Sequence, residues 1–193
     1  MKTLTKLLFV AFSFLFVLAC SKSSDDLLSV DLKSGNLGAD KTHETKMVTV
    51  PFVVDYVGTY TNPGSTTDKC MMNVIVDGVG TGTHVGNSTI HFDFCVDPSN
   101  VPIDAPYGNS EAYIVAANGD TLFVSVEGKV VFGRLEDHPE FVVSWWRDPF
   151  EIWGGTGRFE GATGGGMTDD YNSNEDPNSH HHWEGTITMM KGK

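Results

Sequence analysis

The sequence predicts an all-β protein, an antiparallel barrel or sandwich in a single domain. Between residues 47 and 193, runs of β-branched and aromatic residues recur. Their spacing of about 8 to 12 residues is typical of an antiparallel barrel or sandwich. Gly, Asn or Pro residues separate the runs, and no ten-residue stretch repeats its apolar residues at helical spacing. These observations predict strands joined by short turns.

The N-terminal half of this region contains three predicted strands. Met47–Tyr60 is long and rich in β-branched residues. Pro51 has no backbone N–H to donate to a neighbouring strand, so we expect this proline at a sheet edge or a bulge. Met72–Val76 ends at Asp77–Gly78, a hairpin signal. Thr89–Val96 alternates apolar and polar residues with a period of two, the pattern of a half-buried strand.

The C-terminal half continues the meander. Asn118–Gly119 lies between Glu111–Ala117 and Thr121–Val126, and this dipeptide between alternating runs predicts a hairpin. The remaining predicted strands are Lys129–Leu135, Glu140–Arg147, Phe150–Trp153 and Trp183–Met190.

Residues 154 to 166 contain seven glycines in thirteen positions. Glycine permits backbone angles and close approaches that other residues do not, so we interpret the stretch as a corner of the sheet. Phe159 and Ala162 are three residues apart, and one short helical turn would direct both into the core. A phosphate cradle fits poorly, since Glu160 stands where a dinucleotide motif has its third glycine and no Walker lysine follows.

The segment Gly154-Gly155-Thr156-Gly157-Arg158-Phe159-Glu160-Gly161, preceded by Phe150-Glu151-Ile152-Trp153, resembles a segment of a known family. It is similar to the Gly-Gly-Ser/Thr-Gly-x-Phe-x-Gly segment of the allene oxide cyclase and dirigent-like barrels. The resemblance implies an eight-stranded antiparallel barrel with a central cavity. It does not imply cyclase chemistry, because that family's active-site residues find no matching positions in this sequence.

Residues 1–19 have the composition of a lipoprotein signal peptide. Lys2 and Lys6 precede an apolar run that is too short for a stable membrane span, and Val17-Leu18-Ala19-Cys20 resembles a bacterial lipobox. We therefore expect lipidation at Cys20 and a membrane partner through the acyl chains. The alternative is an ordinary secretory signal. The expected location is the bacterial cell envelope, as an outer-membrane lipoprotein that is periplasmic or surface-exposed.

Residues 20–46 are interpreted as a flexible tether, followed by a β-barrel domain over 47–193. An acidic patch follows Cys20, as in exported surface lipoproteins, although a solvated linker explains it equally well. The chain has 13 basic and 25 acidic residues, a formal net charge of −12. That charge opposes binding to nucleic acid, so we expect no nucleic-acid partner.

Cys70 and Cys95 lie on predicted strands that flank a Gly-rich connection. In an oxidising compartment they are candidates for a disulfide. The alternative is two separate unreactive thiols, since Cys95 falls on the polar face of its strand.

Two polar segments carry residues that can bind metals. His180-His181-His182 offers imidazoles, and Asp170-x-Asn172-x-Asn174-x-Asp176 spaces its oxygens like a calcium loop. In a strand only His180 and His182 would share a face, so the histidine segment lacks a third ligand for a metal. The calcium-like segment has Glu175 at the position where a calcium loop has glycine. We interpret them as a solvated hairpin end and a polar loop, and expect no metal and no cofactor.

His84 and Arg158 sit in glycine-rich backbone, where each either faces a cavity or fixes its loop. The four tryptophans suit a barrel lining or a binding patch, with core packing as the default. The functional hypothesis is a non-catalytic module that binds a small apolar ligand or a surface partner. The alternatives are a cyclase- or isomerase-like enzyme with an apolar substrate in the cavity, and a structural surface lipoprotein without ligand.

Overall fold

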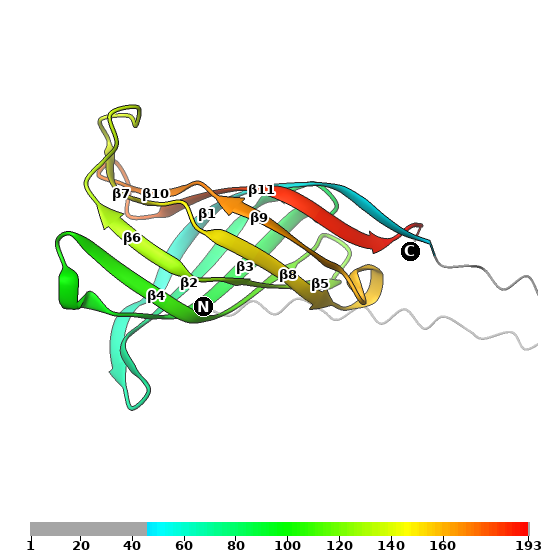
Figure 1. The fold of residues 1–193 in the computed structure, drawn as a ribbon, viewed down its shortest axis with the longest axis horizontal. Coiled ribbons are helices and arrows are strands. Elements are labelled where there is room, and N and C mark those ends of the chain that lie inside the picture. Colours follow the sequence, from blue (N-terminus) through cyan, green and yellow to red (C-terminus); the bar gives the residue numbers. More distant parts are fainter. Residues whose placement is uncertain (1–45, 193) are drawn as a thin grey trace, which may run out of the picture. The chain divides into compact units, whose positions relative to one another are not determined.

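Antiparallel strands close into a ring in the computed structural model, which describes residues 46 to 192 (Figure 1). The described residues lie in one compact unit. The predicted signal peptide, Cys20 and all of the predicted tether except Lys46 lie outside the described residues. The strands are β1 (Met47–Thr67), β2 (Cys70–Gly82), β3 (Gly86–Val96), β4 (Asp104–Val115), β5 (Thr121–Val126), β6 (Gly128–Phe132), β7 (Val142–Trp146), β8 (Pro149–Gly155), β9 (Thr163–Thr168), β10 (Asp170–Ser173) and β11 (Ser179–Met190). Two 3-10 turns accompany them, η1 (Pro98–Asn100) and η2 (Gly157–Phe159).

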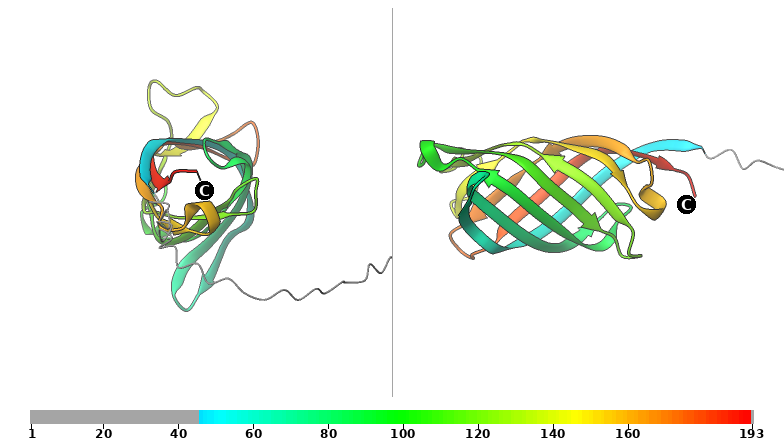
Figure 2. Two further views of the ribbon diagram at one scale, coloured as in Figure 1. Left: turned by 90° about the vertical axis from the view of Figure 1, so that its right-hand side faces the viewer. Right: turned by 90° about the horizontal axis from the view of Figure 1, so that it is seen from below.

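The ring closes because β1 pairs with both β2 and β11. Around it, β5 and β6 both pair with β4, while β9 and β10 both pair with β11. β8 pairs with β5 and β9, and β7 pairs with β6 and β10. β7 and β8 therefore also share one position in the ring. The eleven described strands therefore occupy eight positions around the barrel (Figure 2). The predicted all-β, antiparallel barrel of about eight strands is confirmed.

Alternation along the strands sorts side chains between the inside and the outside of the ring. In β3, Ile90, Phe92 and Val96 are buried, as the period-two pattern predicts. The Asn118–Gly119 hairpin is also confirmed: Gly119 takes a φ of 88° between β4 and β5. Pro51 pairs only with β11, because the β1–β2 ladder begins at Val54, so the proline has one ladder neighbour.

One end of the barrel is filled with apolar side chains. This end carries η2, the first residues of β1 and the last residues of β11 (Figure 1). Phe159 and Ala162 are completely buried there, as the expected helical turn requires. Other fully buried side chains of the core are Phe52, Val54, Ile114, Leu122, Val124, Trp183 and Ile187.

The glycine-rich corner is shorter than predicted. Gly164, Gly165 and Gly166 are not part of a turn but form half of β9, between β8 and β11. A Cβ on Gly166 would overlap the carbonyl oxygen of Glu184. The glycines therefore permit close strand packing, and Gly154 and Gly155 likewise belong to β8. The prediction of a corner over the whole stretch was wrong at both of its ends.

A second prediction was wrong at Asp77–Gly78. β2 continues through both residues to Gly82, and the turn to β3 follows at Thr83–Val85. A Cβ on Gly78 would lie 2.7 Å from Ile90 Cγ2, so this glycine accommodates a neighbouring side chain instead of a turn.

A disulfide joins Cys70 to Cys95, with 5.4 Å between their Cα atoms. It ties the start of β2 to β3 at the end of the barrel opposite η2. Within residues 46–192, no helix has the length and apolar character needed to cross a membrane.

Candidate functional site

A cavity of about 170 Å³ occupies the end of the barrel opposite η2. Every position of the ring contributes to its wall. Seven of the lining side chains are aromatic rings, and these are Tyr60, Phe92, Phe94, Tyr107, Phe132, Trp146 and Trp183. The aliphatic lining comprises Pro63, Met72, Val74, Val76, Val96, Ala105, Val126 and Val130. The barrel is thus packed at one end and hollow at the other.

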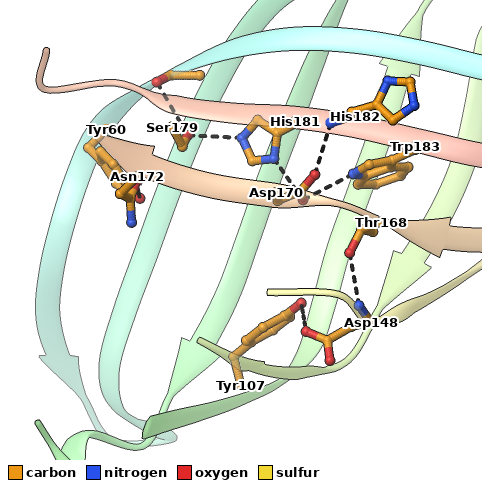
Figure 3. Close-up of polar contacts among 11 residues, drawn as sticks. Tyr60, Tyr107, Asp148, Thr168, Asp170, Asn172, Ser179, His181, His182 and Trp183 are labelled. Carbon is orange, nitrogen blue, oxygen red and sulfur yellow. Dashed lines mark hydrogen bonds and ion pairs between the residues drawn. The ribbon is translucent and has the colours of Figure 1, made fainter. Parts of the chain in front are cut away.

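One wall of the cavity is polar, and β10 and β11 provide most of it (Figure 3). Asp170 on β10 and His181 on β11 are 2% and 7% exposed. His181 Nδ1 lies 3.0 Å from Asp170 Oδ2. Alternate side chains of β11 point into the barrel, and His181 is one of them, while His180 and His182 lie on the other face.

Asp170 accepts two further hydrogen bonds. Trp183 Nε1 donates to Oδ2 at 3.1 Å, and the backbone N–H of His182 donates to Oδ1 at 3.0 Å. A buried carboxylate needs such donors to compensate for the loss of water. Asp170 therefore fixes the orientations of both the imidazole and the indole.

Ser179 completes a row with His181 and Asp170. Its Oγ lies 2.9 Å from His181 Nε2 and 3.3 Å from the carbonyl oxygen of Gly58. His181 Nδ1–H donates to Asp170, and the single hydroxyl proton of Ser179 is shared between two acceptors, the Gly58 carbonyl oxygen and, when it carries no proton, His181 Nε2. This arrangement can hold or move a proton at His181 Nε2.

A second polar row lies beside the first. Tyr60 donates its phenol proton to Asn172 Oδ1 at 2.8 Å, and Asn172 Nδ2 donates to Ser144 Oγ at 2.9 Å. Burial raises the pKa of the Tyr60 phenol, which therefore stays protonated. Ser144 is 4% exposed, and its hydroxyl proton is available to a bound molecule.

Asp148 stands at the break between β7 and β8, behind the ring of Tyr107. Tyr107 donates its phenol proton to Asp148 Oδ2 at 2.8 Å, and Lys129 N donates to the same oxygen at 3.1 Å. Partial burial raises the pKa of the Asp148 carboxyl, and the nearby charge of Asp170 raises it further. Burial and these carboxylates also raise the pKa of Tyr107.

The two predicted cavity or loop residues lie outside the cavity wall. His84, with a φ of 65°, occupies the β2–β3 turn, and its Nε2 lies 3.1 Å from the carbonyl oxygen of Pro51. The Arg158 guanidinium carbon lies 5.4 Å from the Phe159 ring centre, within η2. The His84 contact matches the loop-fixing alternative, whereas Arg158 holds its turn only through its backbone N–H, which donates to Asp120 Oδ2. Neither residue lines the cavity.

The two segments with potential metal ligands are mainly strands. His181 is buried in β11, so the interpretation of the histidine run as a solvated hairpin end was wrong for this residue. Asp170 and Asn172 lie in β10, not in a loop, and their side chains are engaged in the two polar rows. No cluster of three or more potential metal ligands occurs among residues 46–192.

A charged cluster lies on the outer face of β11. His182 Nδ1 is 2.7 Å from Asp55 Oδ1, and His182 Nε2 is 3.2 Å from Glu184 Oε1. The Asp55 carboxylate raises the pKa of His182, and Glu184 contributes in the same direction. The cluster is exposed and does not face the cavity.

Sequence reasoning did not identify the polar wall. A period-two reading of residues 179 to 190 would have placed Ser179, His181 and Trp183 on one face. The link to Asp170 and Asn172 could not be predicted, because it depends on the pairing of β10 with β11.

Comparisons with known proteins find solved structures of low similarity to the chain. No family model matches the chain, and no curated protein matches it. A solved structure of the pterocarpan synthase dirigent protein GePTS1 is 14% identical, with a TM-score of 0.42, over 79% of this chain and 90% of that one. The pterocarpan synthase dirigent protein PsPTS1 is 13% identical, with a TM-score of 0.41, over 76% of this chain and 97% of that one.

Proposed function

We propose that this barrel binds a small, largely apolar ligand in its open end. The observation that carries the proposal is the uneven filling of the barrel: a packed core at one end and a cavity of about 170 Å³ at the other. An eight-stranded barrel is wide enough either to be filled by side chains or to hold one small molecule. This barrel does both, at opposite ends.

The size of the cavity limits the ligand. An apolar cavity of about 150 Å³ in another protein accommodates benzene, whereas sites for drug-sized molecules span roughly 300 to 1,000 Å³. The ligand is therefore about the size of a single ring. Its apolar body contacts the aromatic and aliphatic wall, and a polar group on it faces Ser144 and Asn172.

Filling the cavity tests this proposal. Ala105 lines the cavity and is 3% exposed, so Ala105→Phe places a ring in the space that the ligand needs. Val143, 42% exposed, gives the control Val143→Phe on the outer surface. Phenol, aniline and benzoate are titrated by calorimetry, and small molecules that co-purify are identified by mass spectrometry.

We expect the wild type and Val143→Phe to bind at least one probe or carry a co-purifying molecule, and folded Ala105→Phe to do neither. Circular dichroism establishes that each variant is folded. If the wild type binds no probe and carries no small molecule, the barrel is not a ligand-binding protein of this kind.

We further propose that the protein is held on a bacterial envelope membrane by acyl chains on Cys20. The lipobox-like Val17-Leu18-Ala19-Cys20 supports this proposal. One acyl chain binds only reversibly, whereas two or more anchor a protein stably. Cys20→Ser should move the protein from the membrane fraction to the soluble fraction. An unmodified Cys20 in membrane-bound protein would contradict the anchor.

The Asp170–His181–Ser179 row favours a second candidate function, an enzyme that uses His181 as a base on a small substrate. Its imidazole is oriented by Asp170 and contacts a hydroxyl at the cavity wall. A fluorophosphonate probe tests the activation: Ser179 Oγ would bond to phosphorus, fluoride would leave, and His181 would take the proton. Labelling of Ser179 that is lost in His181→Gln supports the enzyme, and unlabelled Ser179 supports the binding protein.

A further inference from the structure

We propose that the ligand of this cavity is a small organic cation, an alkylammonium or quaternary ammonium ion. The inference rests on the proposed function, since it presumes that the cavity binds a ligand. It adds the charge of that ligand, which the apolar character of the wall alone does not specify.

The aromatic wall is the first observation. Phe94 and Tyr107 have ring centres 5.3 Å apart, and those of Phe92 and Trp183 are 5.7 Å apart. Trp146 and Phe132 add further rings from β7 and β6. The face of an aromatic ring is negative and attracts a cation within about 6 Å, and several rings together bind quaternary ammonium groups.

The charges around the cavity are the second observation. Asp170 lies in the wall at 2% exposure, and Asp148 stands behind Tyr107. Within the described residues, the lining includes neither lysine nor arginine. A buried carboxylate favours a cation and opposes an anion, because little water is present to screen the charge.

His181 lies between this carboxylate and Ser179: its Nδ1–H donates to Asp170, and its Nε2 contacts the Ser179 hydroxyl, which also donates to the carbonyl oxygen of Gly58. Asp170 also accepts from the indole N–H of Trp183, so the carboxylate lies beside the aromatic rings. A ligand ammonium group would supply the positive charge that the wall lacks.

A series of near-isosteric probes isolates the charge. Choline carries a trimethylammonium group, 3,3-dimethyl-1-butanol replaces its nitrogen by carbon, and 3,3-dimethylbutanoate is a comparable anion. Each is titrated into the purified protein by calorimetry at pH 8. We expect choline to bind about tenfold or more tightly than the neutral alcohol, and the anion to bind weakest.

Two variants locate the effect. Asp170→Asn removes the buried charge at nearly constant volume, and Asp169→Asn makes the same change on the exposed neighbour outside the cavity. The preference for choline over the alcohol should fall in Asp170→Asn and persist in Asp169→Asn. If Asp170→Asn fails to fold, Asp148→Asn serves instead, because the amide oxygen of that variant can still accept the Tyr107 phenol proton.

The outcomes separate this inference from the function on which it rests. Equal or tighter binding of the neutral alcohol overturns the cation and leaves the ligand-binding function intact. Absence of binding by all three probes, together with none in the cavity-filling test, overturns both. A choline preference that is unchanged in Asp170→Asn, or in Asp148→Asn where Asp170→Asn does not fold, assigns the cation site elsewhere and also overturns the inference.

Discussion

Single hydrogen bonds decide what the cavity wall presents. Asp170 accepts N–H groups from His181, His182 and Trp183, so one carboxylate positions three consecutive residues of β11. Removing a buried, hydrogen-bonded charge generally costs several kcal/mol of stability, because the groups that donated to it stay buried without an acceptor. The wall is therefore a pre-arranged surface, and its polar atoms need little reorganisation when a ligand enters.

His182 makes the stability of the barrel depend on pH. Asp55 and Glu184 raise its pKa in the folded state, so protonated His182 stabilises the fold. This contribution is complete below the unfolded pKa of about 6.5 and is lost as pH rises through the higher folded pKa. His182→Gln should therefore be less stable than the wild type near pH 6 and nearly equal to it near pH 9.

Urea unfolding at both pH values measures this difference, with His84→Gln in the β2–β3 turn as a control outside the cluster. A His182→Gln deficit that stays constant or grows toward pH 9 would show that the ion pairs do not act as described.

At the scale of the strand, glycine residues allow neighbouring backbones to pack closely in part of the sheet. Gly166 in β9 faces the carbonyl oxygen of Glu184 and the Cα of Gly185, which are backbone atoms that cannot move aside. Gly154 in β8 has only Phe123 Cδ2 near its notional Cβ, at 3.8 Å. The same substitution thus meets different surroundings within one glycine-rich stretch.

Gly166→Ala should destabilise the protein by about 1 to 3 kcal/mol, the usual range for overpacking. Gly154→Ala should change the free energy of unfolding by less than about 0.5 kcal/mol. Chemical denaturation of both variants checks the prediction. Equal effects would mean that β9 does not need its glycine for close packing.

At the scale of the whole molecule, the disulfide stabilises the open end of the barrel. Cys70 and Cys95 are separated by 25 residues in sequence. Cross-linking a loop of this length stabilises the folded state by about 3 kcal/mol, mainly through the unfolded chain. The disulfide lies at the end of the barrel that contains the cavity, so it adds stability where side chains do not fill the interior.

The double variant Cys70→Ala, Cys95→Ala should lose about 3 kcal/mol of unfolding free energy and melt several degrees lower. The comparison is made in a Cys20→Ser background, which removes other thiols. Reductant should lower the melting temperature of the disulfide form and leave the double variant unchanged. Identical melting of the two forms without reductant would contradict the stabilising role.

The sequence by itself determined the all-β class, the Asn118–Gly119 hairpin and the inward Phe159 and Ala162, since local preference and period-two alternation report directly on strands and turns. Regular strand spacing left a barrel or a sandwich open, and the resemblance of the glycine-rich segment to a known family implied the barrel. Only the tertiary structure decided that Gly164–Gly166 form a strand and that one end of the barrel is hollow. It alone joined Asp170 to His181, because pairing between β10 and β11 is a non-local contact that alternation within either strand does not encode.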